Sequence, residues 1–71
     1  MKLGKYRHYK GKEYEVLGVV RHSETLEEMV LYKALYESTY GRDTLWVRPK
    51  GMFQEVITME GKEMPRFDFI G

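Results

Sequence analysis

The residues Tyr14–Glu28, YEVLGVVRHSETLEE, decide the fold, because a long apolar strand pattern in them runs directly into a dense group of polar side chains. The first part of this stretch is rich in the β-branched and aliphatic residues that suit a half-buried strand: Val16, Leu17, Val19 and Val20. Gly18 in their midst predicts a β-bulge or a close approach of another backbone. A strand that bends at such a point is typical of a small barrel.

The polar residues after this strand are the first candidates for a site. Arg21 to Thr25 brings a cation, an imidazole, two hydroxyls and a carboxylate together where the chain must turn. We therefore predict that His22, Ser23 and Glu24 lie at a binding site. Thr25, with Glu28 three residues later, matches a capping box and predicts one short helical turn near Thr25.

Length and composition limit the chain to one domain, residues 1–71, with a single thin core. The absence of cysteine excludes disulfides and thiolate metal sites, so the six Tyr, three Phe and one Trp must supply much of the core. No apolar run approaches the roughly 20 residues that span a bilayer, and the N-terminus lacks the apolar segment of a secretory signal. We expect a cytoplasmic protein that does not bind membranes.

Working outward from the central stretch, alternating patterns and turn residues predict further strands. Gly11 supplies the turn between a first strand and the strand that begins at Tyr14, and Phe53 is expected to anchor the core. In the strand before Pro49, alternation places Thr44, Trp46 and Arg48 on one face and Leu45 and Val47 on the other. The additional strands are predicted over Lys5–Tyr9, Thr44–Arg48, Gln54–Met59 and Lys62–Ile70.

The segment Leu26–Tyr36 fits two structures. Its residues are good helix formers, with Leu26, Met29 and Val30 at helical spacing. However, Met29–Tyr36 is apolar on nearly every face, which suits a strand buried on both sides equally well.

A resemblance to a known family resolves this choice. The runs YRHYKGKEYEVLGVVRHSETLEE (Tyr6–Glu28), VLYKALY (Val30–Tyr36), LWVRP (Leu45–Pro49) and MFQEVI (Met52–Ile57) closely resemble a family of short bacterial proteins, the domain-of-unknown-function family sixteen fifty-three. The resemblance covers about residues 5–70. It implies an all-β fold, a small SH3-like barrel of about five to six strands in which Met29–Tyr36 is a strand, and it brings no established activity or catalytic residue.

The chain carries no motif of a catalytic or metal site. His8 and His22 stand 14 residues apart without any cysteine, which predicts no metal centre. His22 is expected to bond the turn that follows it rather than Ser23, because adjacent residues of an extended chain point to opposite faces. No glycine-rich phosphate loop is present. We therefore expect neither an enzyme nor a cofactor.

The leading functional hypothesis is a non-catalytic binding module whose partner is a segment of another protein. Aromatic and charged side chains of the loops and strands would form the groove. Besides the polar residues His22, Ser23 and Glu24, the candidate site consists of Tyr36, Tyr40, Trp46 and Arg48.

Two other functions remain as hypotheses. Single-stranded RNA could bind the basic N-terminal hairpin, whose cations alternate with stacking aromatics: Lys5, Tyr6, Arg7, Tyr9, Lys10 and Lys12. In the competing interpretation, these tyrosines cover the core and the lysines solvate an edge. A small hydrolase using His22 and Glu24 is the third hypothesis. The net charge of +1 gives no general electrostatic reason to bind nucleic acid.

Overall fold

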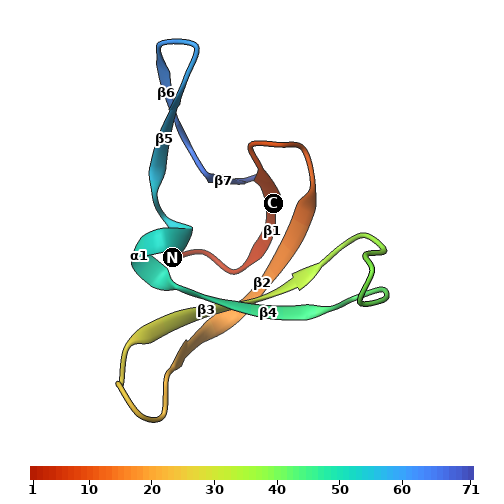
Figure 1. Cartoon of the computed structure of the whole chain (residues 1–71), viewed down its shortest axis with the longest axis vertical. Coiled ribbons are helices and arrows are strands. Elements are labelled where there is room, and N and C mark those ends of the chain that lie inside the picture. Colours follow the sequence, from red (N-terminus) through yellow and green to blue (C-terminus); the bar gives the residue numbers. More distant parts are fainter.

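The computed structural model describes all residues, Met1–Gly71, and is all-β apart from one short helix. Five antiparallel strands form one sheet in the order β4-β3-β2-β1-β7, and β5 and β6 form a separate hairpin that extends from it (Figure 1). No helix is long and apolar enough to cross a membrane. The elements are β1 (Gly4–His8), β2 (Glu13–Arg21), β3 (Glu28–Ala34), β4 (Leu45–Pro49), α1 (Lys50–Phe53), β5 (Val56–Met59), β6 (Lys62–Pro65) and β7 (Phe67–Phe69).

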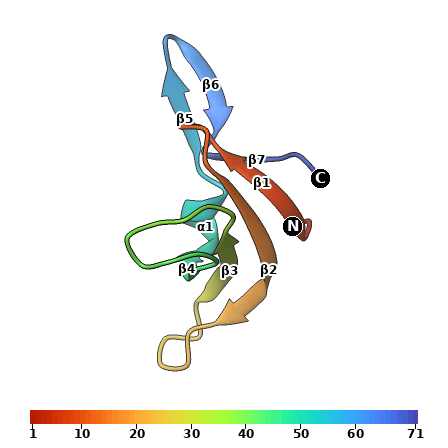
Figure 2. The ribbon, with the colours of Figure 1, turned by 90° about the vertical axis from the view of Figure 1, so that its right-hand side faces the viewer.

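The middle strand β2 bends, and the sheet bends with it (Figure 2). The predicted bulge is confirmed: the pairing of β2 with β3 shifts register between Val16 and Gly18. The other prediction for Gly18, a close approach of another backbone, is wrong, since a Cβ at this position would meet no atom within 4 Å. The bulge increases the local twist and turns one face of the sheet inward around α1.

The segment that fitted both helix and strand is a strand, as the resemblance implied, but it ends at Ala34, two residues before the predicted end at Tyr36. β3 lies between β2 and β4, and alternate residues of it point to the inner face, where Val30, Tyr32 and Ala34 are buried. Its outward residues, Met29, Leu31 and Lys33, are partly exposed. Burial of one whole face outweighs the small differences in helix propensity.

Aromatic rings form most of the core, as the composition requires. Phe53 is 1% exposed, which confirms it as a core anchor, and its ring stacks on that of Phe67 at 4.1 Å. It also meets Tyr6 and Tyr32 edge-on, at 5.4 and 5.3 Å between centroids. The one turn of helix α1 thus inserts a ring between strands that are distant in the sequence.

The sheet does not close by hydrogen bonds between its first and last strands, β4 and β7. β4 ends at Pro49, which has no N–H to donate, and the chain turns at once into α1. The Phe53 side chain of α1 packs into the core beside the sheet. The all-β class is confirmed. The structure has seven strands in two sheets instead of about five to six, and the barrel is not closed, because β4 is an open edge.

Two local predictions are wrong. Near Thr25 there is no helix, because Leu26 takes a left-handed backbone conformation (φ 63°) that ends the turn after one Leu26 N–H bond to the His22 carbonyl. The strand predicted over Lys62–Ile70 is two strands, since Arg66 bonds through its backbone to Glu55 on one side and to Tyr9 on the other. The chain changes partner there, from β5 to β1.

Candidate binding site

A hollow of ≈ 210 Å³ lies on the inner face of the sheet where β2, β3 and β4 run side by side. Strand register gathers its side chains: Trp46 pairs with Tyr32 across β3 and β4, and Arg48 pairs with Val30 on the same face. Its lining consists of four aromatic rings and one cation, namely Tyr14, Tyr32, Tyr36, Trp46 and Arg48. The predicted alternation of β4, with Trp46 and Arg48 on one face, is confirmed by this register.

Two tyrosines at the hollow hydrogen-bond each other. The hydroxyl oxygens of Tyr14 and Tyr36 are 2.7 Å apart. One hydroxyl proton is used between them, so the pair keeps one O–H to donate to a ligand, together with free lone pairs. Burial, the hydrogen bond to Tyr36 and the nearby phenols raise the pKa of Tyr14 well above its ordinary value of 10.0. The hydroxyl of Tyr14 therefore keeps its proton at physiological pH.

The charges at the hollow are positive and lack carboxylate partners. Arg48 and Lys12 take part in none of the four Lys or Arg ion pairs of the protein, which join other side chains. The Arg48 guanidinium lies 5.7 Å from the centre of the Phe67 ring, and the Lys12 ammonium lies 4.7 Å from that of Tyr36. These cations disfavour a cationic ligand and favour a carboxylate.

The raised pKa of Tyr14 predicts a loss of stability in alkaline solution. A folded-state pKa above the unfolded value means that the folded chain holds the proton more tightly. The contribution of Tyr14 to the unfolding free energy is therefore fully present below pH 10 and is lost as the pH rises further. In Tyr14→Phe this contribution is absent. We expect its unfolding free energy to fall with pH less steeply than that of the wild type, by up to about 1.4 kcal/mol per pH unit. Urea unfolding between pH 9 and 11 measures both slopes; identical slopes would contradict the assignment.

The loop between β3 and β4 is held against the edge of the hollow. Tyr40, 75% exposed, meets the Trp46 indole edge-on with 5.6 Å between ring centroids. Ser38 and Gly41 bond each other through their backbones, and the Thr44 hydroxyl donates to the Gly41 carbonyl at 3.3 Å. Tyr36, Tyr40, Trp46 and Arg48, four of the predicted site residues, therefore lie together.

The other three predicted site residues, His22, Ser23 and Glu24, lie elsewhere. They belong to the loop between β2 and β3, at the end where Arg21 pairs with Glu28, whereas the hollow lies at the end where Tyr14 pairs with Ala34. His22 bonds its own turn, as predicted: its Nδ1 accepts the N–H groups of Glu24 at 3.1 Å and Thr25 at 3.3 Å. Ser23 bonds the Glu24 carboxylate. The group is a surface turn at the end of the β2–β3 pair opposite to Tyr14, and none of its three residues lines the hollow.

Some residues of the basic hairpin already make contacts within the fold. Tyr6 is in the core and its hydroxyl donates to the Lys2 carbonyl, while Arg7 pairs with Glu13 at 3.0 Å. Lys10 lies over the ring of Tyr9, at 5.8 Å. Lys5 points to the outer face. Of the six residues proposed for RNA, then, one stacking ring is buried and one cation is already paired.

His8 belongs to the turn of the same hairpin. Its Nδ1 accepts the Lys10 N–H at 3.1 Å, and its ring meets Phe67 edge-on at 4.9 Å. Burial, followed by the charges of Arg66, Arg48 and Lys10, lowers the pKa of His8. No group of three or more His, Asp or Glu side chains is arranged to hold a metal ion.

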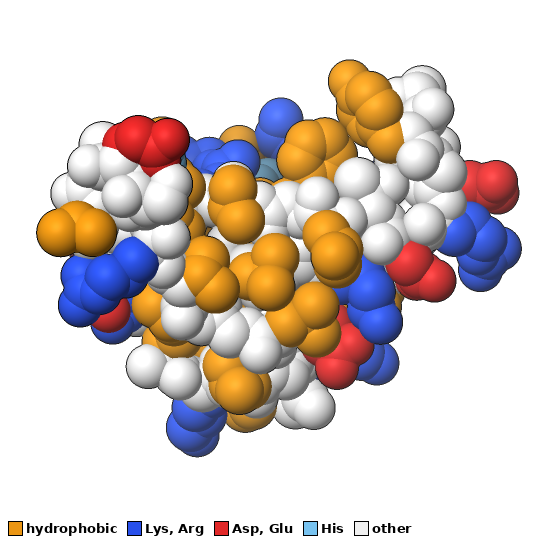
Figure 3. All heavy atoms as spheres, turned by 90° about the horizontal axis from the view of Figure 1, so that it is seen from below, with side chains coloured by type: hydrophobic (Ala, Val, Ile, Leu, Met, Phe, Trp, Pro, Cys, Tyr) orange, Lys and Arg blue, Asp and Glu red, His pale blue; other side chains and the backbone are white.

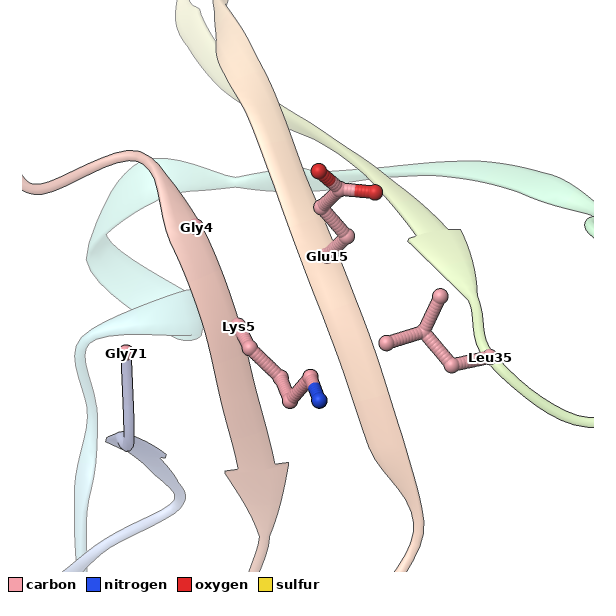
Figure 4. A pocket seen from close by; sticks show the side chains of 5 residues that line it. All are labelled: Gly4, Lys5, Glu15, Leu35 and Gly71. Carbon is pink, nitrogen blue, oxygen red and sulfur yellow. The ribbon is translucent and has the colours of Figure 1, made fainter.

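A second, larger hollow of ≈ 330 Å³ lies on the outer face (Figure 4). It has one apolar side chain and no aromatic ring, and its carboxylate already pairs with Lys33 at 3.4 Å. We regard the smaller aromatic hollow as the better site, because it combines four rings with an unpaired cation, Arg48. The lining of the larger one is Gly4, Lys5, Glu15, Leu35 and Gly71.

Sequence reasoning missed two residues of the aromatic hollow, Tyr14 and Tyr32. Each lies in a strand that was predicted, and each has the same inward alternation as a buried neighbour, Val16 or Val30. The signal is thus visible along each strand. The register between the strands, which brings both rings beside Trp46, is visible only in the structure.

Comparisons with known proteins agree on one family. The chain matches the family "Protein of unknown function (DUF1653)" over residues 4–69. No curated protein has a sequence that matches this one. A crystal structure of a DUF1653 protein from Bordetella bronchiseptica is similar to the whole chain, with 35% identity and a TM-score of 0.90, and the similarity covers 88% of that protein's chain. The similarity implied by the sequence motifs is thus confirmed over nearly the whole length, and the chain belongs to the DUF1653 family.

Proposed function

We propose that this protein is a non-catalytic binding module and that its aromatic hollow binds an acidic segment of a partner protein. The observation that carries the proposal is the combination of four aromatic rings with an unpaired Arg48 in one hollow. Rings supply apolar area at little cost in conformational entropy, and arginine supplies directional bonds to carboxylates. Both are frequent at the centres of protein interfaces.

The size of the site suits a protein segment. A hollow of ≈ 210 Å³ is smaller than the pockets of about 300–1,000 Å³ that enclose small molecules, and suits one or two side chains of a longer ligand. A ring of the partner would pack against Trp46, and a carboxylate beside it would bond Arg48. The spare hydroxyl proton of the Tyr14–Tyr36 pair is a further donor for that carboxylate.

The two alternative functions have less support. In the hydrolase hypothesis, His22 would act as a base, but its Nδ1 already accepts two backbone N–H groups and Ser23 bonds Glu24 instead. In the RNA hypothesis, the basic hairpin would need free rings and cations, of which Tyr6 is buried and Arg7 is paired.

Substitutions at the hollow should weaken binding of an acidic peptide. The probe is the acetylated and amidated peptide Val-Asp-Val-Tyr-Val-Thr, whose only charge is its aspartate. We expect Arg48→Gln and Trp46→Ala each to lower its affinity at least about tenfold, because one removes a charge-assisted bond and the other the largest ring. Amide chemical shifts of the labelled protein, followed during titration, measure the affinity and locate the site.

The matched control is Leu17→Ala, which shortens an exposed side chain on the opposite face. It should leave the affinity unchanged, and thermal unfolding should show that all three variants are folded. Equal affinity of Arg48→Gln, Trp46→Ala and wild type would contradict the proposal. Tight, salt-sensitive binding of oligouridine, lost when Arg7, Lys10 and Lys12 are all changed to Gln, would replace it with the RNA hypothesis.

A further inference from the structure

We infer that the partner segment binds as an additional antiparallel strand along β4, so that the sheet gains a sixth strand next to the hollow. The inference rests on the proposed function, since it specifies how the segment reaches the aromatic rings. It adds a backbone conformation, a direction and an alternating side-chain pattern to the description of the partner.

The free edge of β4 supplies the backbone groups. Ala34 donates its N–H to the Thr44 carbonyl at 2.9 Å, and antiparallel ladders bond at every second residue, so Trp46 and Arg48 bond toward β3. The N–H and C=O groups of Leu45 and Val47 consequently point away from the sheet. No strand pairs with them. They form a short template of two donors and two acceptors.

The two edges of the sheet differ in how well they are protected. β7 has three residues, and a short edge strand offers little to an incoming chain. β4 has five residues, is protected at its last residue, Pro49, and carries one inward charge, Arg48, which disfavours an apolar or basic strand but pairs with a carboxylate of an acidic one. The edge with the better template is the one beside the hollow.

Side chains on the two faces of β4 specify the alternation of the partner. A strand laid along β4 would direct every second side chain inward, over Trp46 and Arg48. Its other side chains would lie outward beside Leu45 and Val47, which are 56% and 55% exposed. Figure 3 shows the molecule from below: apolar side chains gather over β2, β3 and β4, and charged side chains surround them. The pattern that fits is acidic or aromatic inward and aliphatic outward.

Charge favours a different protein over a second copy of this chain. Three symmetric antiparallel registers of β4 with its own copy use the Leu45 and Val47 groups. They place Arg48 opposite Arg42, Thr44 or Trp46 of the copy. None brings a carboxylate to Arg48, whereas an acidic residue of a partner does.

Methylation of selected amides in the probe peptide tests the inference. In antiparallel register, the aspartate lies opposite Arg48, the tyrosine opposite Trp46, and the valines in the third and fifth places opposite Val47 and Leu45. N-methyl groups on these two valines remove the donors that face β4. We expect this peptide to bind at least about tenfold more weakly than the parent. Methylation of the aspartate and tyrosine amides, which point away from β4, is the matched control and should leave binding unchanged.

The outcomes separate the binding mode from the site. Strand addition also predicts that the parent peptide slows exchange of the Leu45 and Val47 amides. Equal affinity of the two methylated peptides, with shifts at the hollow that Arg48→Gln abolishes, would overturn strand addition and leave the proposed function intact. Failure of the parent peptide to bind would overturn both. Concentration-dependent protection of the same amides without peptide would show that a second copy occupies the edge, and would overturn the inference alone.

Discussion

Phe53→Ala is expected to lower the unfolding free energy by about 3–5 kcal/mol, because it truncates the largest fully buried side chain of the core. The ring is 1% exposed and contacts Tyr6, Tyr32 and Phe67, which come from three different strands. Its removal leaves a cavity between α1 and the sheet. The total unfolding free energy of a folded domain is only about 5–15 kcal/mol, so a large part of the stability depends on this one side chain.

Urea unfolding followed by circular dichroism measures this loss. Met52→Ala is the matched control, since Met52 precedes Phe53 in α1 and is 51% exposed. It should change the unfolding free energy by no more than about 0.5 kcal/mol. If the two variants were equally stable, the ring of Phe53 would not be the link between α1 and the sheet.

Gly4→Ala is expected to cost about 1–3 kcal/mol. Gly4 has φ 130°, a backbone conformation that residues other than glycine rarely adopt, and a Cβ there would lie 3.3 Å from an atom of the Phe69 ring. The substitution therefore strains the start of β1 and presses on its contact with β7. Loss of that contact would also disturb Tyr6, whose ring meets Phe69 at 5.3 Å.

Gly18→Ala is the comparison that isolates the backbone effect. Gly18 has no positive φ, and a Cβ there would meet nothing within 4 Å. We expect its unfolding free energy to stay within about 0.5 kcal/mol of the wild type. Melting temperatures of the two variants decide the matter; similar destabilisation of both would mean that conformation at Gly4 is not the cause.

Sequence patterns predicted most strands because they depend on residues near each other in the chain. The alternation of β4 and the bulge at Gly18 are of this kind. For Met29–Tyr36 local patterns were ambiguous, and only the family resemblance favoured the strand. The division of Lys62–Ile70 into two strands depends on Arg66 exchanging backbone bonds with Glu55 and Tyr9, which no local pattern reveals.

The candidate site was predicted in part for the same reason. Trp46 and Arg48 share a face by alternation alone, so their association was predictable. Tyr14 lies beside them only because of the pairing register in two strand pairs, β2 with β3 and β3 with β4. His22 was grouped with these residues because it is polar and adjacent to the long strand, but a strand has two ends, and His22 lies at the end away from the hollow.

The fluorescence of Trp46 tests the central claim most directly. It is the one tryptophan of the chain, it lines the hollow, and it is 37% exposed, so its emission reports whether a ligand excludes water there. Titration with the peptide Val-Asp-Val-Tyr-Val-Thr should shift the emission to shorter wavelength until the site is saturated. Arg48→Gln, or replacement of the peptide's aspartate by asparagine, should lower the affinity measured from this shift at least about tenfold. An emission spectrum that does not change at any peptide concentration would contradict the claim that the hollow is a binding site for an acidic protein segment.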